Sequence, residues 1–140
     1  MLDKERVLGK IDDLGAYLTE LKQIVPDSFA DYQIIEKKRS CERLLHRCIE
    51  CAVDICKLFV SGLKLGLPHE ENDLFDKMSK NNILSPEMIS LLKEMRAFRN
   101  ILIHEYAEVD NEIVYEMAKT RLGDFELFKK EIVNALKTLS

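Results

Sequence analysis

The sequence predicts an all-α protein: an up-and-down bundle of four main helices with one short extra helix, in a single domain over residues 1–140. Apolar residues recur at steps of three and four along most of the chain, which is the period of a helix that buries one face. The chain holds only five Gly and three Pro, and these separate long segments from one another. No stretch alternates apolar and polar residues with the period of two that a half-buried strand shows. Long amphipathic segments with short connections therefore favour a helical bundle.

The first two main helices follow from their apolar stripes. The first helix ends before Pro26, and its stripe consists of Val7, Ile11, Leu14, Leu18, Leu21 and Val25. A turn is predicted at Pro26-Asp27-Ser28. The second helix is ended by Gly62, Gly66 and Pro68, and its stripe consists of Cys41, Leu45, Cys48, Ala52, Ile55, Phe59 and Leu63. We expect both stripes to face the core.

The remaining helices are predicted from their start signals. A short amphipathic helix is expected from Glu70 to Lys80. Ser85-Pro86-Glu87 predicts the start of the third main helix, because Ser caps a helix, Pro is tolerated at the first helical position and Glu suits the positive end of the dipole. Asp110 is the expected cap of the last helix, which we predict as one element with the apolar face Val114, Ala118, Phe125, Phe128, Ile132, Leu136 and Leu139.

Composition excludes several classes of protein. With 21 Lys plus Arg against 25 Asp plus Glu, the net charge of −4 argues against a general polycation that coats nucleic acid, but it leaves room for a small basic site. Lys64 interrupts the most apolar segment, Leu58 to Leu67, so no stretch approaches the roughly 18 to 20 apolar residues of a membrane span. The N-terminus is charged and lacks an apolar leader segment, and the four Cys crowd between positions 41 and 56. These features indicate a cytoplasmic protein with reduced thiols and no membrane partner.

The segment from Arg96 to Tyr106 holds most of the side chains that are capable of chemistry. Arg99 offers a planar fork of donors that suits a phosphate, and the ordinary pKa of His104, near about 6.5, lets it give or take a proton near neutrality. Together the two residues would supply the groups needed to cleave RNA without a metal. His104 would act as a general base on a ribose 2′-hydroxyl or as an acid toward the leaving oxygen, while Arg99 steadies charge on the phosphorus.

Geometry limits what one chain can do with this pair. On a continuous helix, Arg99 and His104 would point about 140° apart and be offset by roughly 7.5 Å along the axis. Either the helix breaks around residue 103, or the working site combines residues from two subunits. A symmetric homodimer would bring a second Arg99 and a second His104 to the same cleft. The competing interpretation is structural: a surface pair, or a cation at the negative end of a helix dipole.

A zinc site is the other candidate that the residue types suggest. Cys48 and Cys51 lie close in sequence to Cys41, Cys56 and His46. One helix cannot wrap four ligands tetrahedrally around an ion, so buried structural thiols are the expected interpretation and no metal is predicted.

The motif Arg99-Asn100-x-x-x-His104-x-Tyr106 resembles the signature of the HEPN superfamily, and more closely that of the HepT-like toxins of bacteria and archaea. The run Glu50-Cys51-Ala52-Val53-Asp54-Ile55 also resembles the second-helix pattern of that family. The resemblance extends over nearly the whole chain, because its length, helix order and motif position fit as well.

The resemblance implies a HEPN-like, homodimeric, metal-independent endoribonuclease that is the toxin of a toxin–antitoxin pair and needs no cofactor. The implied partner is a minimal nucleotidyltransferase antitoxin, and the implied substrate is RNA. Arg99 and His104 correspond to the catalytic residues of the family. Tyr106 corresponds to the residue that such an antitoxin blocks by AMPylation, because an attached adenylate places bulk and negative charge beside Arg99.

Three supporting residues are also implied. Asn100 would orient the His or contact the ribose, and Glu50 and Asp54 would hold the Arg or His of the neighbouring helix. Glu50 and Asp54 are four residues apart, as are Arg43 and Arg47, so an ion-pair network within one helix explains them equally well.

Two alternatives to a ribonuclease remain open at this point. The first is a non-catalytic module that binds nucleotide or RNA and presents it to a nucleotidyltransferase, with Arg99 and His104 as phosphate contacts. The second is a purely structural bundle. An acidic protein with a local basic cleft is expected to hold RNA at few phosphates, so its RNA binding would depend weakly on salt.

Overall fold

The structure is a computed structural model that describes residues 1–103 and 110–139. Within these two ranges the chain forms helices and no strand, which confirms the predicted all-α class. The helices are α1 (Lys4–Ile24), α2 (Phe29–Tyr32), α3 (Ile35–Gly62), α4 (Glu71–Lys80), α5 (Pro86–Ile103), α6 (Asn111–Thr120) and α7 (Gly123–Thr138).

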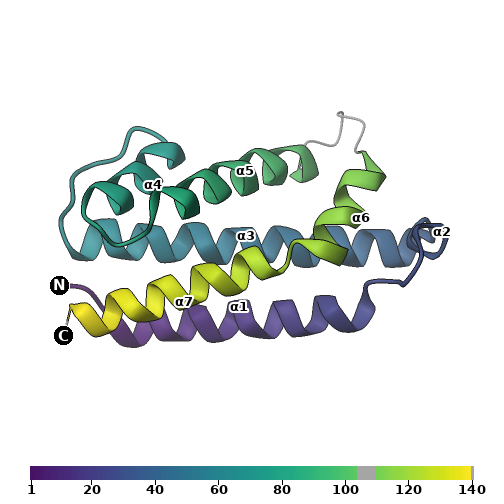
Figure 1. The fold of residues 1–140 in the computed structure, drawn as a ribbon, viewed down its shortest axis with the longest axis horizontal. Helices are drawn as coiled ribbons and strands as arrows, with labels where there is room; N and C mark the ends of the chain where they lie inside the picture. The colour runs from purple at the N-terminus through teal and green to yellow at the C-terminus, as the bar shows by residue number, and fades with distance from the viewer. Residues whose placement is uncertain (104–109, 140) are drawn as a thin grey trace.

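The long helices run alternately in opposite directions (Figure 1). α1 and α3 lie antiparallel and form the most extensive helix pair. α5 runs back along α3, and α6 and α7 together return toward the end where the chain began, so both termini lie at the same end of the bundle. The short helix α4 packs against α3 and α5. The predicted up-and-down order is therefore correct.

Helix starts follow the predicted capping residues. The Ser85 hydroxyl accepts a hydrogen bond from the backbone N–H of Met88 at 3.1 Å, at the start of α5. Both the backbone N–H and the hydroxyl of Ser85 also donate to Glu131 of α7, at 2.8 and 3.0 Å, which ties this start to the last helix. Asp110 caps α6 by accepting from two backbone N–H groups. The bonds that the Ser85 hydroxyl and the Asp110 carboxylate accept each satisfy a donor that a helix leaves unpaired at its first turn.

One hydrophobic core fills the bundle and takes side chains from every helix. All four Cys thiols are buried in α3, as expected for structural thiols. Burial raises their pKa, to about 12 for Cys48, because a thiolate is poorly solvated in apolar surroundings. In the part of the chain that the structure describes, no group of three His, Cys, Asp or Glu side chains could hold a metal ion.

The last helix is not continuous, and this prediction is wrong. α6 ends at Thr120 and α7 begins at Gly123, with Arg121 and Leu122 between them. Gly123 has a low helix propensity, because glycine loses more conformational freedom on folding than other residues. The break places Leu122 in the core, where 7% of it is exposed. The Arg121 guanidinium holds the corner by binding Asp124 at 3.0 Å and Glu94 of α5 at 2.9 Å.

The short helix α2 was not predicted. It follows the predicted turn, and its cap is Ser28, whose hydroxyl accepts from the N–H of Asp31 at 3.2 Å. α2 places Phe29 and the fully buried Tyr32 against Tyr115 of α6, with the Tyr32 and Tyr115 ring centroids 5.2 Å apart. The Tyr115 hydroxyl donates to the Pro26 carbonyl at 2.8 Å. This aromatic cluster closes one end of the bundle.

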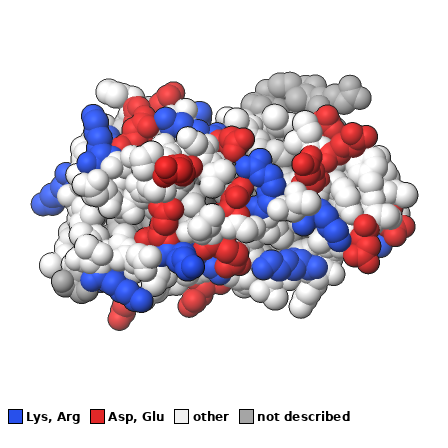
Figure 2. Space-filling model, in the orientation of Figure 1, with Lys and Arg blue, Asp and Glu red and all other residues white. Residues whose placement is uncertain are grey.

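The surface carries charges of both signs. On the face shown in Figure 2, Lys and Arg side chains are interspersed with Asp and Glu, and neither sign forms a large continuous area. No helix among the described residues is both long and apolar enough to cross a membrane. A cluster of ion-paired side chains lies partly buried between α3, α4 and α5.

Candidate active site

Arg99 is the one charged residue that is buried in the described part of the chain. It lies in the last turn and a half of α5, and only 7% of it is exposed. A buried guanidinium is costly unless carboxylates pair with it and accept its hydrogen bonds. The structure supplies two such carboxylates, from two other helices.

Both terminal nitrogens of the Arg99 guanidinium donate two hydrogen bonds each. Nη1 donates to Glu50 of α3 and to Glu71 of α4, each at 2.9 Å. Nη2 donates to the other oxygen of Glu71 and, at 3.2 Å, to the side-chain oxygen of Asn100. Glu71 is thus bound by the paired, two-bond contact that Arg and carboxylate geometry allows. The remaining donor, Nε, is buried without a hydrogen-bond partner among the described residues.

Glu71 joins two cations of α5. Its Oε1 also accepts from Arg96 Nε at 3.0 Å, one helical turn before Arg99. The hydrogen bond from Arg99, helped by Arg96, lowers the pKa of Glu71 against the opposing effect of burial. The same bond raises the pKa of Arg99. Both groups are therefore charged at neutral pH, and Glu71 is an anchor for Arg99.

Glu50 is held less firmly. It makes one hydrogen bond to Arg99, and its side chain is 41% exposed, against 22% for Glu71. Its Oε1 also lies 3.6 Å from Nε2 of His46, one turn earlier on α3. The expected contact of Glu50 with the Arg of the neighbouring helix is present.

Asp54 does not contact the motif Arg. It binds Lys10 of α1 at 3.2 Å instead, on the side of α3 that faces α1. Arg47, on the same helix, lies over the Tyr17 ring of α1 at 5.6 Å from its centroid. The alternative of an ion-pair network within α3 is therefore wrong for Asp54, because its partner Lys10 lies on α1. Glu50 makes its shorter ion pair with Arg99 of α5 and a longer one with His46 of α3.

The motif is only partly covered by the described residues. Arg99 and Asn100 lie on α5, and the Asn100 side chain contacts Arg99. The predicted catalytic His104 and the predicted modification site Tyr106 lie outside the described residues. The roles of all these residues stay predictions.

Sequence reasoning missed Glu71. It belongs to the short extra helix, where its position in the first turn indicates only a favourable place for an acidic residue. A buried Arg requires a carboxylate partner, but the chain has 25 acidic residues and no spacing rule selects this one.

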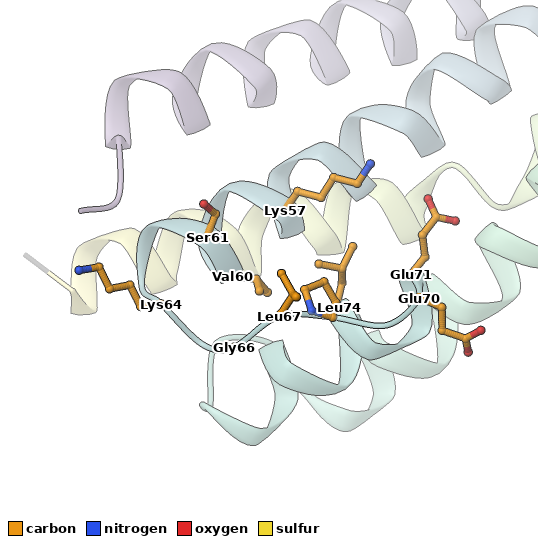
Figure 3. A pocket seen from close by; sticks show the side chains of 10 residues that line it. Lys57, Val60, Ser61, Lys64, Gly66, Leu67, Glu70, Glu71 and Leu74 are labelled. Atoms are coloured by element: carbon orange, nitrogen blue, oxygen red, sulfur yellow. The ribbon is translucent and has the colours of Figure 1, made fainter.

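An open groove lies beside this cluster and shares Glu71 with it (Figure 3). It has a volume of about 630 Å³, between the end of α3, the connection to α4 and the start of α4. Val60, Leu67 and Leu74 form its apolar wall. Lys57 and Lys64 lie on its α3 side, and neither forms an ion pair with any described residue. The groove is thus lined by two lysines without an ion-pair partner and by two carboxylates, Glu70 and Glu71.

Comparison with known proteins relates the chain to nucleases. Residues 14–132 match a family described as ribonuclease HepT-like. The chain is 29% identical over 122 residues to the mRNA nuclease HepT of Shewanella oneidensis, which covers 87% of this chain and 92% of that relative. It is 30% identical over 131 residues to the tRNA nuclease HepT of Aphanizomenon flos-aquae, which covers 93% of this chain and 89% of that relative.

Several solved structures with the same fold are toxin–antitoxin complexes. A crystal structure of a toxin–antitoxin with AMP-PNP superposes with a TM-score of 0.85 at 27% identity, over 91% of this chain and 97% of that one. The tri-AMPylated Shewanella oneidensis HEPN toxin in complex with MNT antitoxin also has a TM-score of 0.85, at 28% identity, over 91% of this chain and 96% of that one.

Proposed function

The chain belongs to the HepT-like ribonuclease family, and on this premise we propose that it is the metal-independent endoribonuclease toxin of a toxin–antitoxin pair. Its partner is a minimal nucleotidyltransferase antitoxin, and its substrate is RNA. The single HEPN-like domain spans residues 1–140. The observation that carries the proposal is the buried Arg99, held by two carboxylates near the described end of α5, five residues before His104.

The relatives support both parts of the proposal. Two of them are named as nucleases of mRNA and of tRNA, and they align with about nine tenths of the chain. One solved structure of similar fold pairs an AMPylated HEPN toxin with an MNT antitoxin, and another is a toxin–antitoxin with AMP-PNP.

The cleavage chemistry assigns one role to each motif residue. The ribose 2′-oxygen bonds to the phosphorus, and the bond between phosphorus and the leaving 5′-oxygen breaks. His104 takes the proton of the 2′-hydroxyl or, when protonated, gives one to the leaving oxygen. Arg99 stabilises the negative charge that builds on the phosphoryl oxygens. Asn100, which contacts the Arg99 guanidinium, helps to orient the site.

Homodimerisation completes the site in this proposal. A twofold axis near the end of α5 brings two copies of His104 together, so that one imidazole accepts a proton while the other donates one. The two Arg99 side chains then face one cleft.

Regulation acts on Tyr106 in this proposal. The antitoxin transfers an adenylyl group from ATP to the phenol oxygen and releases pyrophosphate. The attached phosphodiester brings a negative charge and the adenosine brings bulk, so an RNA phosphate can no longer reach Arg99. The protein acts in the cytoplasm, in keeping with its four buried, unpaired thiols.

The RNA strand follows α3 away from Arg99. Lys57 lies seven residues after Glu50, which places it on nearly the same face of α3 and about 10 Å further along the axis. Lys57 and Lys64 therefore supply phosphate contacts beside the groove, because no ion pair with a described carboxylate holds either of them. Two such contacts fit the weak salt dependence expected of this acidic protein.

The experiment compares the protein made alone with the protein made together with a minimal nucleotidyltransferase antitoxin. Intact mass and cleavage of total RNA in the presence of a chelator are measured for both samples, with His104→Ala as the catalytic control. We expect AMP units on Tyr106 after coexpression, and RNA cleavage only by the unmodified protein with His104 intact. RNA that stays whole with the unmodified protein would favour a non-catalytic binding module, and cleavage that persists in His104→Ala would refute the role of His104.

A further inference from the structure

Arg99 has no free terminal donor in the structure, although the proposed reaction requires it to bind a phosphate. Both terminal nitrogens are engaged, by Glu50, Glu71 and Asn100. The Nε donor is buried and faces no described acceptor. A phosphate can therefore reach the guanidinium only by displacing one of its present partners.

We propose that the two carboxylates have opposite tasks: Glu71 stays in place and positions Arg99, whereas Glu50 leaves and the RNA phosphate takes its position on Nη1. This inference rests on the proposed ribonuclease function. It makes Glu71 a positioning residue of the site, and it makes Glu50 an internal competitor of the substrate.

The contacts of Glu71 favour its staying. It binds two cations, Arg96 and Arg99, with hydrogen bonds to three of their nitrogen atoms. It also lies in the first turn of α4, where the positive end of the helix dipole stabilises a carboxylate. Removing it would leave two neighbouring guanidiniums without their shared anion, one of them buried.

The contacts of Glu50 favour its release. It accepts one hydrogen bond from Arg99, through an Nη1 that Glu71 also binds, and almost half of its side chain is exposed. His46 Nε2 lies 3.6 Å from Glu50 Oε1 and offers a second partner after release. An RNA phosphodiester carries one negative charge, as Glu50 does, so the exchange leaves the charge beside Arg99 unchanged.

The test uses two matched variants, Glu50→Gln and Glu71→Gln, each of which removes one negative charge with little change of shape. Affinity is measured with a 2′-O-methyl RNA oligonucleotide of mixed sequence, which cannot be cleaved because the attacking hydroxyl is blocked. Turnover is measured with the unmodified oligonucleotide. The control is Glu94→Gln, which removes an exposed carboxylate from the same helix as Arg99, where it binds Arg121.

We expect Glu50→Gln to tighten RNA binding by about two- to fivefold, the range that a partly exposed ion pair is worth. We expect Glu71→Gln to lower kcat by about tenfold or more, because a misplaced catalytic group costs at least that much. Glu94→Gln changes neither quantity. The two variants thus differ in which of affinity and turnover they alter, which loss of stability alone would not produce.

Two outcomes would overturn the inference. Weaker RNA binding in Glu50→Gln would show that Glu50 supports the phosphate site, and unchanged kcat in Glu71→Gln would show that Arg99 needs no anchor. Thermal unfolding of each variant establishes that the assays are made on folded protein, and Glu71→Asp provides a milder change if Glu71→Gln does not fold. Failure of the proposed function is separate, because the wild-type protein would then cleave no RNA, while the affinity measurement would still test Glu50.

Discussion

The carboxylate of Glu71 accepts hydrogen bonds from Arg96 and Arg99, which lie one turn apart on α5. One side chain of the short helix α4 thereby helps to hold the motif Arg of the main bundle in place. The ten-residue helix α4 thus supplies an anion to α5 in addition to the buried Leu74, Phe75 and Met78 that it adds to the core. α4 is a structural support of the candidate active site.

Glu71 and Arg99 are expected to be energetically coupled. Glu71→Gln and Arg99→Gln each remove one charge of the pair, and the double variant removes both. Because the two groups share hydrogen bonds in a largely buried place, the effects on the free energy of unfolding should be non-additive by about 0.5 to 3 kcal/mol. Urea denaturation of the four proteins measures the coupling. Additive effects would mean that the pair contributes nothing specific to the fold.

Stability should depend on acid pH through Glu71. A carboxyl whose pKa is lower in the folded state stabilises the fold above its unfolded pKa, about 4.3 for Glu, and this contribution is lost as the pH falls through the folded pKa. Since the pKa of Glu71 is lowered mainly by its bond to Arg99, the wild type should lose more stability on acidification than Glu71→Gln. Thermal unfolding from about pH 6 to pH 3 compares the two proteins. Parallel curves would contradict the ion pair.

Two glycines should respond to Ala in opposite directions. A Cβ at Gly62, the last residue of α3, would lie 2.7 Å from the backbone Cα of Leu2, so Gly62→Ala should destabilise the protein by about 1 to 3 kcal/mol. A Cβ at Gly9, inside α1, meets nothing within 4 Å, so Gly9→Ala should stabilise by about 0.5 to 1 kcal/mol. Urea denaturation measures both. A neutral Gly62→Ala would mean that the N-terminal segment moves aside at no cost.

Lys57 should contribute affinity for RNA without sequence preference. Lys57→Glu is expected to weaken binding of different RNA oligonucleotides to a similar degree and to reduce the slope of log affinity against log salt by about one. Lys119→Glu is a suitable control, because Lys119 of α6 already pairs with Asp27 at 3.2 Å. Binding that is equally weak in both variants would indicate a general charge effect.

The helices themselves were largely readable from the sequence. Local signals suffice where a side chain acts on its own backbone, as Ser85 and Asp110 do at the starts of α5 and α6. The single last helix was wrong because the apolar steps from Ala118 to Phe125 fit one continuous period equally well. The packing of Leu122 into the core and the ion pairs of Arg121 favour a break at this point. These are tertiary contacts, so the apolar period of the sequence does not reveal them.

In the candidate site, too, local features were predictable from the sequence and tertiary contacts were not. The motif from Arg99 to Tyr106 is a local pattern, so the chain alone was enough to indicate its family and its chemistry. The state of Arg99 is not local: its partners Glu71 and Glu50 lie 28 and 49 residues away in the chain. Only the packing of α3 and α4 against α5 selects these two carboxylates, because a short-range hydrogen bond between distant residues exists only once their helices are in contact. Because of that packing, the Arg99 guanidinium is buried and hydrogen-bonded to carboxylates rather than exposed and free to bind a ligand.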